Sequence, residues 1–146
     1  MTHLIGAGLA IGLAAIGVTI GQGLTAKKAL EVTSKNPEMK GTVMIYTIIL
    51  IALIESAAIY GFVIGLQIVG AEAIDAMQAI GAGLAIGLAG LGAGLGEGFA
   101  ASQALAAIHR NPDAKGTIMI YMILFIALVE SAAIYGFVLA LQMLGA

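Results

Sequence analysis

Residues 5–14 read IGAGLAIGLA, and the same ten letters recur at residues 80–89. A second block, ESAAIYGFV at residues 55–63, recurs at residues 130–138. Both recurrences have an offset of 75 residues, and at this offset 41 of the 71 aligned positions are identical. The chain is therefore a tandem duplication of one unit, and each unit must fold in the same way.

The composition is that of a membrane protein. Of the 146 residues, 61% are hydrophobic and only 10% are charged, and the mean hydropathy is +1.09. Soluble domains are about 45–50% apolar and about 25% charged, so a water-soluble enzyme is excluded. The absence of cysteine excludes a disulfide framework, a zinc ribbon and a thiolate nucleophile. The net charge of −2 argues against nucleic acid as a partner.

Long stretches without charge predict the membrane spans. They cover residues 4–26, 41–54, 56–71, 76–96, 98–108, 116–129 and 131–146. A span takes about 20 mostly apolar residues, so we expect helices over residues 4–33, 42–70, 79–108 and 117–145. No basic segment precedes the first apolar run, which is therefore expected to be a mature span and not a cleaved signal.

These spans predict an all-α membrane protein made of two tandem helical hairpins. The first hairpin is expected at residues 1–71, a short outer linker at 72–75, and the second hairpin at 76–146. Each unit has two spans, so both copies enter the membrane in the same orientation. The repeats are therefore parallel, unlike the inverted repeats of many transporters.

Basic residues indicate the orientation. They gather near the two turns, at Lys27, Lys28, Lys35, Lys40, Arg110 and Lys115. The linker carries only Glu72 and Asp75. The positive-inside rule then predicts a cell-membrane protein with both turns in the cytoplasm and both termini outside. The turns contain the two prolines, in Asn36-Pro37 and Asn111-Pro112, which break the helices.

Two glutamates, Glu55 and Glu130, fall in the middle of predicted spans. An ionised carboxylate there costs about 2.5–3.5 kcal/mol on insertion scales, so such a residue indicates function. The alternative is a protonated glutamate that hydrogen-bonds to a neighbouring helix. The duplication of the same acid in the same nine-residue block favours the functional interpretation.

A second polar position lies on the first helix of each hairpin, Gln22 in one and Glu97 in the other. Gln22 lies 12 residues before Ser34, and Glu55 lies 13 residues after Thr42. Because helices rise equally per residue, Gln22 and Glu55 are predicted at the same depth. In the second hairpin the same count predicts Glu97 and Glu130 at the same depth. Further hydroxyl groups follow each acid, on Ser56, Tyr60, Ser131 and Tyr135, although packing alone would also explain the tyrosines.

These groups suit a cation. An acid alone can hold a proton, whereas a hard metal ion needs several oxygens in place of its hydration shell. The amide, carboxylate and hydroxyl oxygens favour Na⁺, with H⁺ as the alternative. In the second hairpin two carboxylates would lie close together, so either Glu97 or Glu130 is expected to hold a proton while the other binds the cation. The alternative is that Glu97 is a proton-only site.

The first helix of each hairpin is rich in glycine. Residues 90–98 read GLGAGLGEG, and the first copy has Gly17, Gly21 and Gly23. The pattern lacks the GxxxxGK[ST] letters of a phosphate-binding loop. In a membrane helix small residues allow backbones to approach closely. Such slim helices suit the crowded inner wall of a ring of many helices.

These features together resemble the rotor-ring c-subunit (the proteolipid) of rotary F-type ATP synthases, over essentially the whole chain, twice. The turns Lys35-Asn36-Pro37 and Arg110-Asn111-Pro112 are close to the family's Arg-Gln-Pro turn. Sodium-binding members are similar in having Gln on the first helix and Glu-Ser and Tyr on the second. Some sodium-dependent members carry Glu in place of that Gln, as at Glu97. The threonine that often follows the serine is replaced here by Ala57 and Ala132.

The resemblance implies a non-catalytic, ion-translocating protein that needs no cofactor. Hairpins would assemble into a homo-oligomeric ring in membrane lipid, with glycine helices inside and carboxylate helices outside. By this resemblance the backbone carbonyls of Leu53 and Leu128 would join the ion ligands across each seam. The turns would dock on the central stalk, and the outer face would move against the a-subunit of the stator. Both hairpins keep their acid, so the number of ions per hairpin would match that of a ring of single-hairpin subunits. We therefore expect the ring to permit ATP synthesis as well as hydrolysis.

Two other classes compete with this interpretation. A small four-helix proton-coupled transporter would also place glutamates in the membrane, but it would usually have aromatic substrate contacts, and this chain has no tryptophan. A structural pore-forming oligomer such as a holin leaves the duplicated polar residues unexplained. His3 and His109 have no metal-ligand spacing and are expected at the membrane interface.

Overall fold

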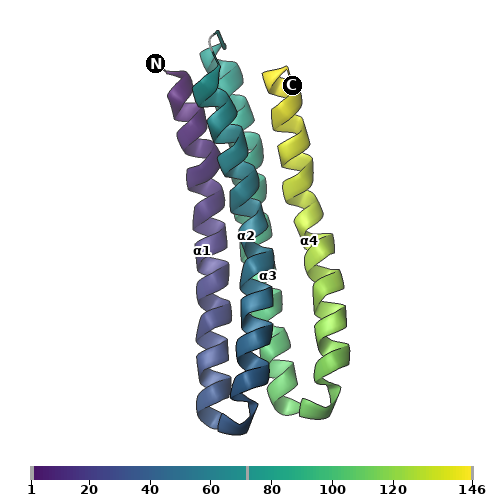
Figure 1. Ribbon diagram of the computed structural model, residues 1–146. Helices are drawn as coiled ribbons and strands as arrows, with labels where there is room; N and C mark the ends of the chain where they lie inside the picture. Colours follow the sequence, from purple (N-terminus) through teal and green to yellow (C-terminus); the bar gives the residue numbers. More distant parts are fainter. Residues whose placement is uncertain (1, 72, 146) are drawn as a thin grey trace.

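Four long helices make up the computed structural model, which describes residues 2–71 and 73–145 (Figure 1). They are α1 (His3–Lys35), α2 (Lys40–Gly70), α3 (Ala76–Arg110) and α4 (Lys115–Leu144). Both chain ends lie at one end of the bundle and both tight turns at the other. Of the predicted linker, Glu72 lies outside the described residues.

Each helix is long and apolar enough to cross a membrane. The helices contain between 30 and 35 residues. At about 1.5 Å per residue they exceed the hydrocarbon thickness of roughly 30 Å. The prediction of four spans in two tandem hairpins is confirmed, and the chain is a multi-pass membrane protein.

The turns are shorter than the sequence predicts. Asn36 ends α1 with φ −140° and ψ 81°, and Pro37–Met39 form one turn of 3₁₀ helix. Helix α2 then begins at Lys40, two residues before the predicted start. Proline suits the first position of a helix because its missing N–H would have no partner there. Pro112–Ala114 repeat this turn before α4.

Helix α3 also begins earlier than predicted, at Ala76 and not at residue 79. The cause is the side chain of Asp75, which accepts hydrogen bonds from the backbone N–H groups of Met77 (2.9 Å) and Gln78 (3.2 Å). This is an N-cap, which satisfies donors that lack helical partners in the first turn.

Helices α1 and α3 pack against each other backbone to backbone. A Cβ atom added at Gly98 would lie 2.0 Å from the Cα atom of Gly21, and one added at Gly21 would lie 2.1 Å from the carbonyl oxygen of Gly94. Gly6 and Gly83 make a second approach of this kind nearer the chain ends. The glycines thus serve close helix packing, as membrane helices often use them.

Helices α2 and α4 pack against this α1–α3 pair and keep one face open. Large apolar side chains on that face are exposed, including Ile45 and Ile48 on α2 and Ile120 and Leu124 on α4. In a membrane protein such a surface contacts lipid. The glycine-rich helices α1 and α3 therefore form one layer of the bundle, and the helices α2 and α4, which carry Glu55 and Glu130, lie against it.

Candidate ion-binding sites

The first site joins Gln22 of α1 to Glu55 of α2. The side-chain amide nitrogen of Gln22 donates a hydrogen bond to Glu55 Oε2 at 2.5 Å, and it approaches the carbonyl oxygen of Ile51 at 3.4 Å. The structure thus brings together the pair that residue counting from the turn places at one depth. The carboxylate of Glu55 is exposed at the surface of the single chain.

The second site lies between the two hairpins. Glu130 of α4 is partly buried, and its Oε1 accepts a hydrogen bond of 2.8 Å from the hydroxyl of Tyr60. Tyr60 belongs to α2 of the first hairpin, so this contact crosses the seam between the repeats. Its counterpart in the second hairpin, Tyr135, is 70% exposed.

Glu97 distinguishes the second site from the first. Its side chain is fully buried in α3, and neither carboxyl oxygen has a hydrogen-bond partner within the described residues. Buried polar groups are nearly always hydrogen-bonded, and a buried charge without a partner is strongly disfavoured. Glu97 therefore lies where a proton, a water molecule or a cation would be needed to satisfy it.

Each acid is followed by a serine whose hydroxyl turns back to its own helix. Ser56 Oγ donates to the carbonyl oxygen of Leu53 at 2.7 Å, and Ser131 Oγ donates to that of Leu128 at 2.7 Å. The structure thus brings each serine to the carbonyl that the family resemblance assigns as a ligand. It does not place either serine in hydrogen-bond contact with its neighbouring carboxylate.

The two mid-span carboxylates have different partners. Glu55 accepts from the N–H group of the Gln22 amide, and Glu130 accepts from the hydroxyl group of Tyr60. Carboxylate, hydroxyl and carbonyl oxygens are hard ligands that suit alkali or alkaline-earth cations. No group of three or more His, Cys, Asp or Glu residues that could hold a metal is found among the described residues.

Sequence reasoning missed the partner of Tyr60. The spacing from Glu55 to Tyr60 directs attention to the acid of the same helix, whereas the hydroxyl reaches Glu130 in the other hairpin. Helical spacing describes contacts along one helix and contains no information about the lateral neighbour. The exact repetition of ESAAIYGFV was an available signal, because it shows that each hairpin presents both halves of such a contact.

The fold and these contacts define a class: membrane proteins of paired helical hairpins with a mid-span glutamate on the second helix of each hairpin. A comparison with known families agrees with this class. The family model of the ATP synthase C-subunit matches the chain twice, over residues 5–77 and 80–143. The chain therefore belongs to the ATP synthase C-subunit family, whose members are non-catalytic membrane proteins that form the rotor ring.

Known relatives match one hairpin at a time. The ATP synthase c-subunit of Carboxydothermus hydrogenoformans is 45% identical over 64 residues, which is 44% of this chain and 78% of the relative. The chloroplastic c-subunit of Euglena gracilis is 46% identical over 66 residues, covering 45% of this chain and 82% of the relative. A c-subunit of Dehalococcoides mccartyi is 44% identical over 66 residues, covering 45% and 87%. One hairpin of this chain thus corresponds to most of such a relative.

Proposed function

We propose that this protein carries Na⁺ on Glu55 and Glu130 through the membrane part of an ATP synthase, so that ion flow drives rotation of the ring. The alternative cargo is H⁺. The observation that supports Na⁺ is the direct contact between the Gln22 amide and the Glu55 carboxylate. A proton on a carboxylate needs no amide beside it, whereas Na⁺ requires several oxygens around it.

The contacts of the first site support one ligand set. Glu55 would supply the charge, and Gln22, held beside it by its N–H group, would turn its amide oxygen to the ion. Ser56 would supply a hydroxyl oxygen, and by the family resemblance the Leu128 carbonyl of the adjacent hairpin would supply another across the seam. Tyr135 of the adjacent hairpin would hold the carboxylate as Tyr60 holds Glu130.

The second site uses Glu130 and Ser131 in the same way, with the Leu53 carbonyl of the first hairpin across the seam and Glu97 in place of the glutamine. Two ionised carboxylates in an apolar layer would repel each other, so one of them retains a proton when the other binds the ion. A protonated Glu97 offers a carbonyl oxygen where Gln22 offers an amide oxygen. Its complete burial supports the neutral form.

Rotation then follows from charge neutrality. A glutamate that holds its ion is neutral overall and can face lipid, whereas an empty, ionised glutamate cannot. On the a-subunit of the stator, one fixed positive charge would compete for the carboxylate and release the ion to one side. An ion that crosses the membrane gains about 2.3 kcal/mol per 100 mV. Because both hairpins keep their acid, every hairpin contributes to this exchange, and the ring can support ATP synthesis.

The orientation follows from charge. We place both turns in the cytoplasm, where the central stalk would dock, and both termini outside. Lys28 and Lys35 lie near the first turn, at the end of α1. Their Nζ atoms lie 2.5 and 2.7 Å from the carboxylate oxygens of Glu31. The second turn carries Arg110 and Lys115, while the opposite end has no Lys or Arg.

Carbodiimide labelling tests the ion assignment, because this reagent modifies protonated carboxyl groups inside membranes. The purified oligomer is labelled at fixed pH with Na⁺, with K⁺ or with neither, and each glutamate is followed by mass spectrometry. Protection of Glu55 and Glu130 by Na⁺ but not by K⁺ is the expected result. Labelling that depends on pH alone would establish a proton ring, and an absence of labelling at both residues would contradict the rotor role of these acids.

A further inference from the structure

The residues around Gln22 differ between the two hairpins. Residues 19–25 read TIGQGLT, and the equivalent residues 94–100 read GLGEGFA. Gln22 thus has a threonine three residues away on either side, Thr19 and Thr25, whereas the acid of the second hairpin has a glycine and an alanine there. Residues three apart on a helix lie on one face, with Cβ atoms about 5–6 Å apart. The hairpin with the neutral amide therefore has two hydroxyl groups near its site that the other hairpin lacks.

The two threonines have different surroundings. Thr25 is fully buried, and its hydroxyl donates to the carbonyl oxygen of Gly21 at 2.9 Å. Thr19 is exposed, and its hydroxyl donates to the carbonyl oxygen of Ala15 at 2.8 Å. In both cases the proton is used within the helix, so the lone pairs of the hydroxyl oxygen remain as acceptors. Of the two residues, only Thr19 presents these lone pairs at the surface of the chain.

Thr19 lies on the same open side of the hairpin as the first ion site. A Cβ added at Gly17 or Gly21 would lie 2.2 or 2.1 Å from a backbone oxygen of α3. Thr19 is two residues from each of these glycines, which is about 200° around a helix, so its side chain points away from α3. Glu55 is exposed as well, and its partner Gln22 lies one turn from Thr19. The three side chains therefore line one edge of the chain.

The equivalent position in the second hairpin has no room for a side chain. A Cβ added at Gly94 would lie 2.6 Å from the backbone nitrogen of Val18 and 2.8 Å from the carbonyl carbon of Gly17. The second site thus lies beside a tight backbone contact that leaves no space for water. A helix that packs on the Thr19 side cannot approach as closely, because the threonine side chain occupies that space. The seam beside the first site is therefore wider at this level.

The first site also lacks an oxygen from α1. The side-chain nitrogen of Gln22 donates to Glu55, so the amide leaves one oxygen for the ion. A hard cation needs several oxygens around it, and a retained water molecule is among its usual ligands. An enclosed water molecule needs about two to four polar partners of its own. The hydroxyl oxygen of Thr19, one turn from Gln22, is such a partner.

We propose that Thr19 is a further ion-binding residue of the first site. Its hydroxyl oxygen accepts a hydrogen bond from a water molecule, and the oxygen of that water ligates the Na⁺ held by Glu55. The second site has Gly94 at this position and binds its ion without this water. The inference rests on the proposed function, because it requires Na⁺ at Glu55, and it deepens that function by making the two sites of one chain chemically different.

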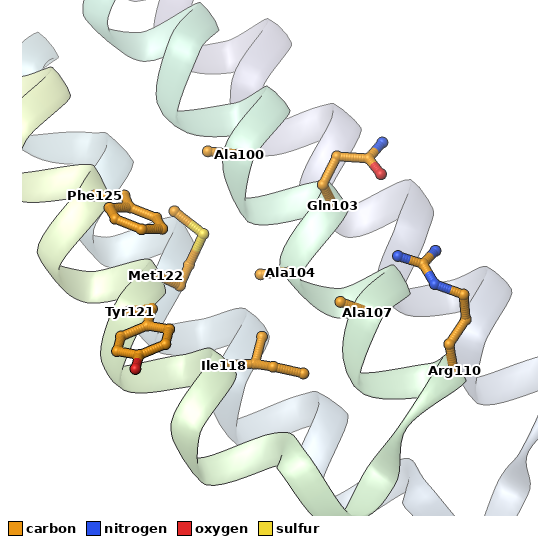
Figure 2. A pocket seen from close by; sticks show the side chains of 9 residues that line it. All are labelled: Ala100, Gln103, Ala104, Ala107, Arg110, Ile118, Tyr121, Met122 and Phe125. Carbon is orange, nitrogen blue, oxygen red and sulfur yellow. The ribbon is translucent and has the colours of Figure 1, made fainter.

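Thr25 is the matched control for this role. It is a threonine at the same spacing from Gln22, but its hydroxyl is enclosed within its own chain. The equivalent residue, Ala100, lines an apolar groove between α3 and α4 together with Met122 and Phe125 (Figure 2). This side of the helix is therefore apolar in the second hairpin and closed in the first, and neither arrangement places a hydroxyl at an ion site.

Replacement of Thr19 by valine tests the proposal, because valine is also β-branched but has no hydroxyl group. The purified oligomer of the full chain is labelled with carbodiimide at fixed pH over a range of Na⁺ concentrations, and Glu55 and Glu130 are followed separately by mass spectrometry. In Thr19→Val the Na⁺ concentration that half-protects Glu55 is expected to rise about fivefold, as for the loss of one hydrogen bond. Glu130 should be unaffected, and Thr19→Ser and Thr25→Val should behave like the parent chain.

Labelling without Na⁺ separates a ligand role from a packing role. A proton on Glu55 needs no water beside it, so the pH of half-maximal labelling is expected to be the same in Thr19→Val and in the parent. A packing defect would move this pH as well as the Na⁺ requirement, and such a result would overturn the proposal. If Thr19→Val does not assemble, Thr19→Ala removes the hydroxyl without added bulk and must give the same shift at Glu55.

An unchanged Na⁺ requirement at Glu55 in Thr19→Val would refute the role of Thr19 and leave the ion assignment intact. An equal shift in Thr25→Val, or a shift at Glu130 as large as that at Glu55, would refute it too. Failure of the proposed function is visible in the parent chain itself, where Na⁺ would then give Glu55 no protection. That result would overturn this inference together with the ion assignment.

Discussion

Gly98→Ala is expected to separate the two hairpins beside the second ion site. The added Cβ would lie 2.0 Å from the Cα atom of Gly21 and 2.6 Å from its carbonyl carbon and oxygen. Ordinary contacts of a Cβ begin at 3.4 Å. Helices α1 and α3 must therefore move apart by about 1.4 Å, because a backbone atom has no other rotamer to adopt.

The magnitude combines two opposing effects. Overpacking costs about 1–3 kcal/mol when side chains can adjust, and backbone partners place this case at the upper limit. Alanine regains about 1 kcal/mol of helix propensity. The net loss is about 2 kcal/mol. Gly116→Ala is the matched control, since its Cβ would meet nothing within 4 Å of the described chain and only the propensity gain applies.

The assay is the loss of helix content during titration with a denaturing detergent, compared between the two variants and the parent chain. Gly98→Ala should unfold at lower detergent than the parent, and Gly116→Ala should not. Equal stability of the two variants would refute the packing of α1 on α3 at this register. Because Glu97 precedes Gly98, the same variant should also weaken sodium protection of Glu130.

Two further predictions concern the second site. Tyr60→Phe removes one hydrogen bond, of about 1 kcal/mol, from Glu130; the sodium concentration that protects Glu130 from carbodiimide should rise roughly fivefold, with no change at the site of the first hairpin. Glu97→Gln gives the second site the amide of the first, so the two labelling curves should converge; curves that stay apart would show that the difference between the sites lies elsewhere.

Contacts inside each hairpin could be predicted from the sequence. Residues can be counted from the tight turn along both of its helices. Because each helix rises equally per residue, this count places Gln22 opposite Glu55. The duplicated letters predict the same pairing of Glu97 with Glu130, but within the described residues the carboxyl oxygens of Glu97 make no hydrogen bond. The number of spans could also be predicted from the charge-free stretches, because a helix needs only sufficient length and apolar side chains to span the membrane.

Contacts between the hairpins could not be predicted in this way. Helices α2 and α4 are apolar around their whole circumference, so they have no amphipathic stripe that indicates which side faces the neighbour. That side is set by the close approach of Gly21 to Gly98, which the spacing of residues along the sequence does not indicate. The contact of Tyr60 with Glu130 also lies between the hairpins and depends on how they pack.

The fusion of two hairpins into one chain has an arithmetic consequence for the machine. Each chain brings two of the proposed ion-carrying glutamates, Glu55 and Glu130. Under the proposed function, a ring made only of this chain would hold an even number of ions, and rings of neighbouring size would differ by two ions per turn. The chain, and not the hairpin, would then be the repeating unit of rotation. Because Thr19 and Glu97 each occur in one hairpin only, successive ions would meet the stator in alternating surroundings, and the energy profile of a full turn would repeat at every second site.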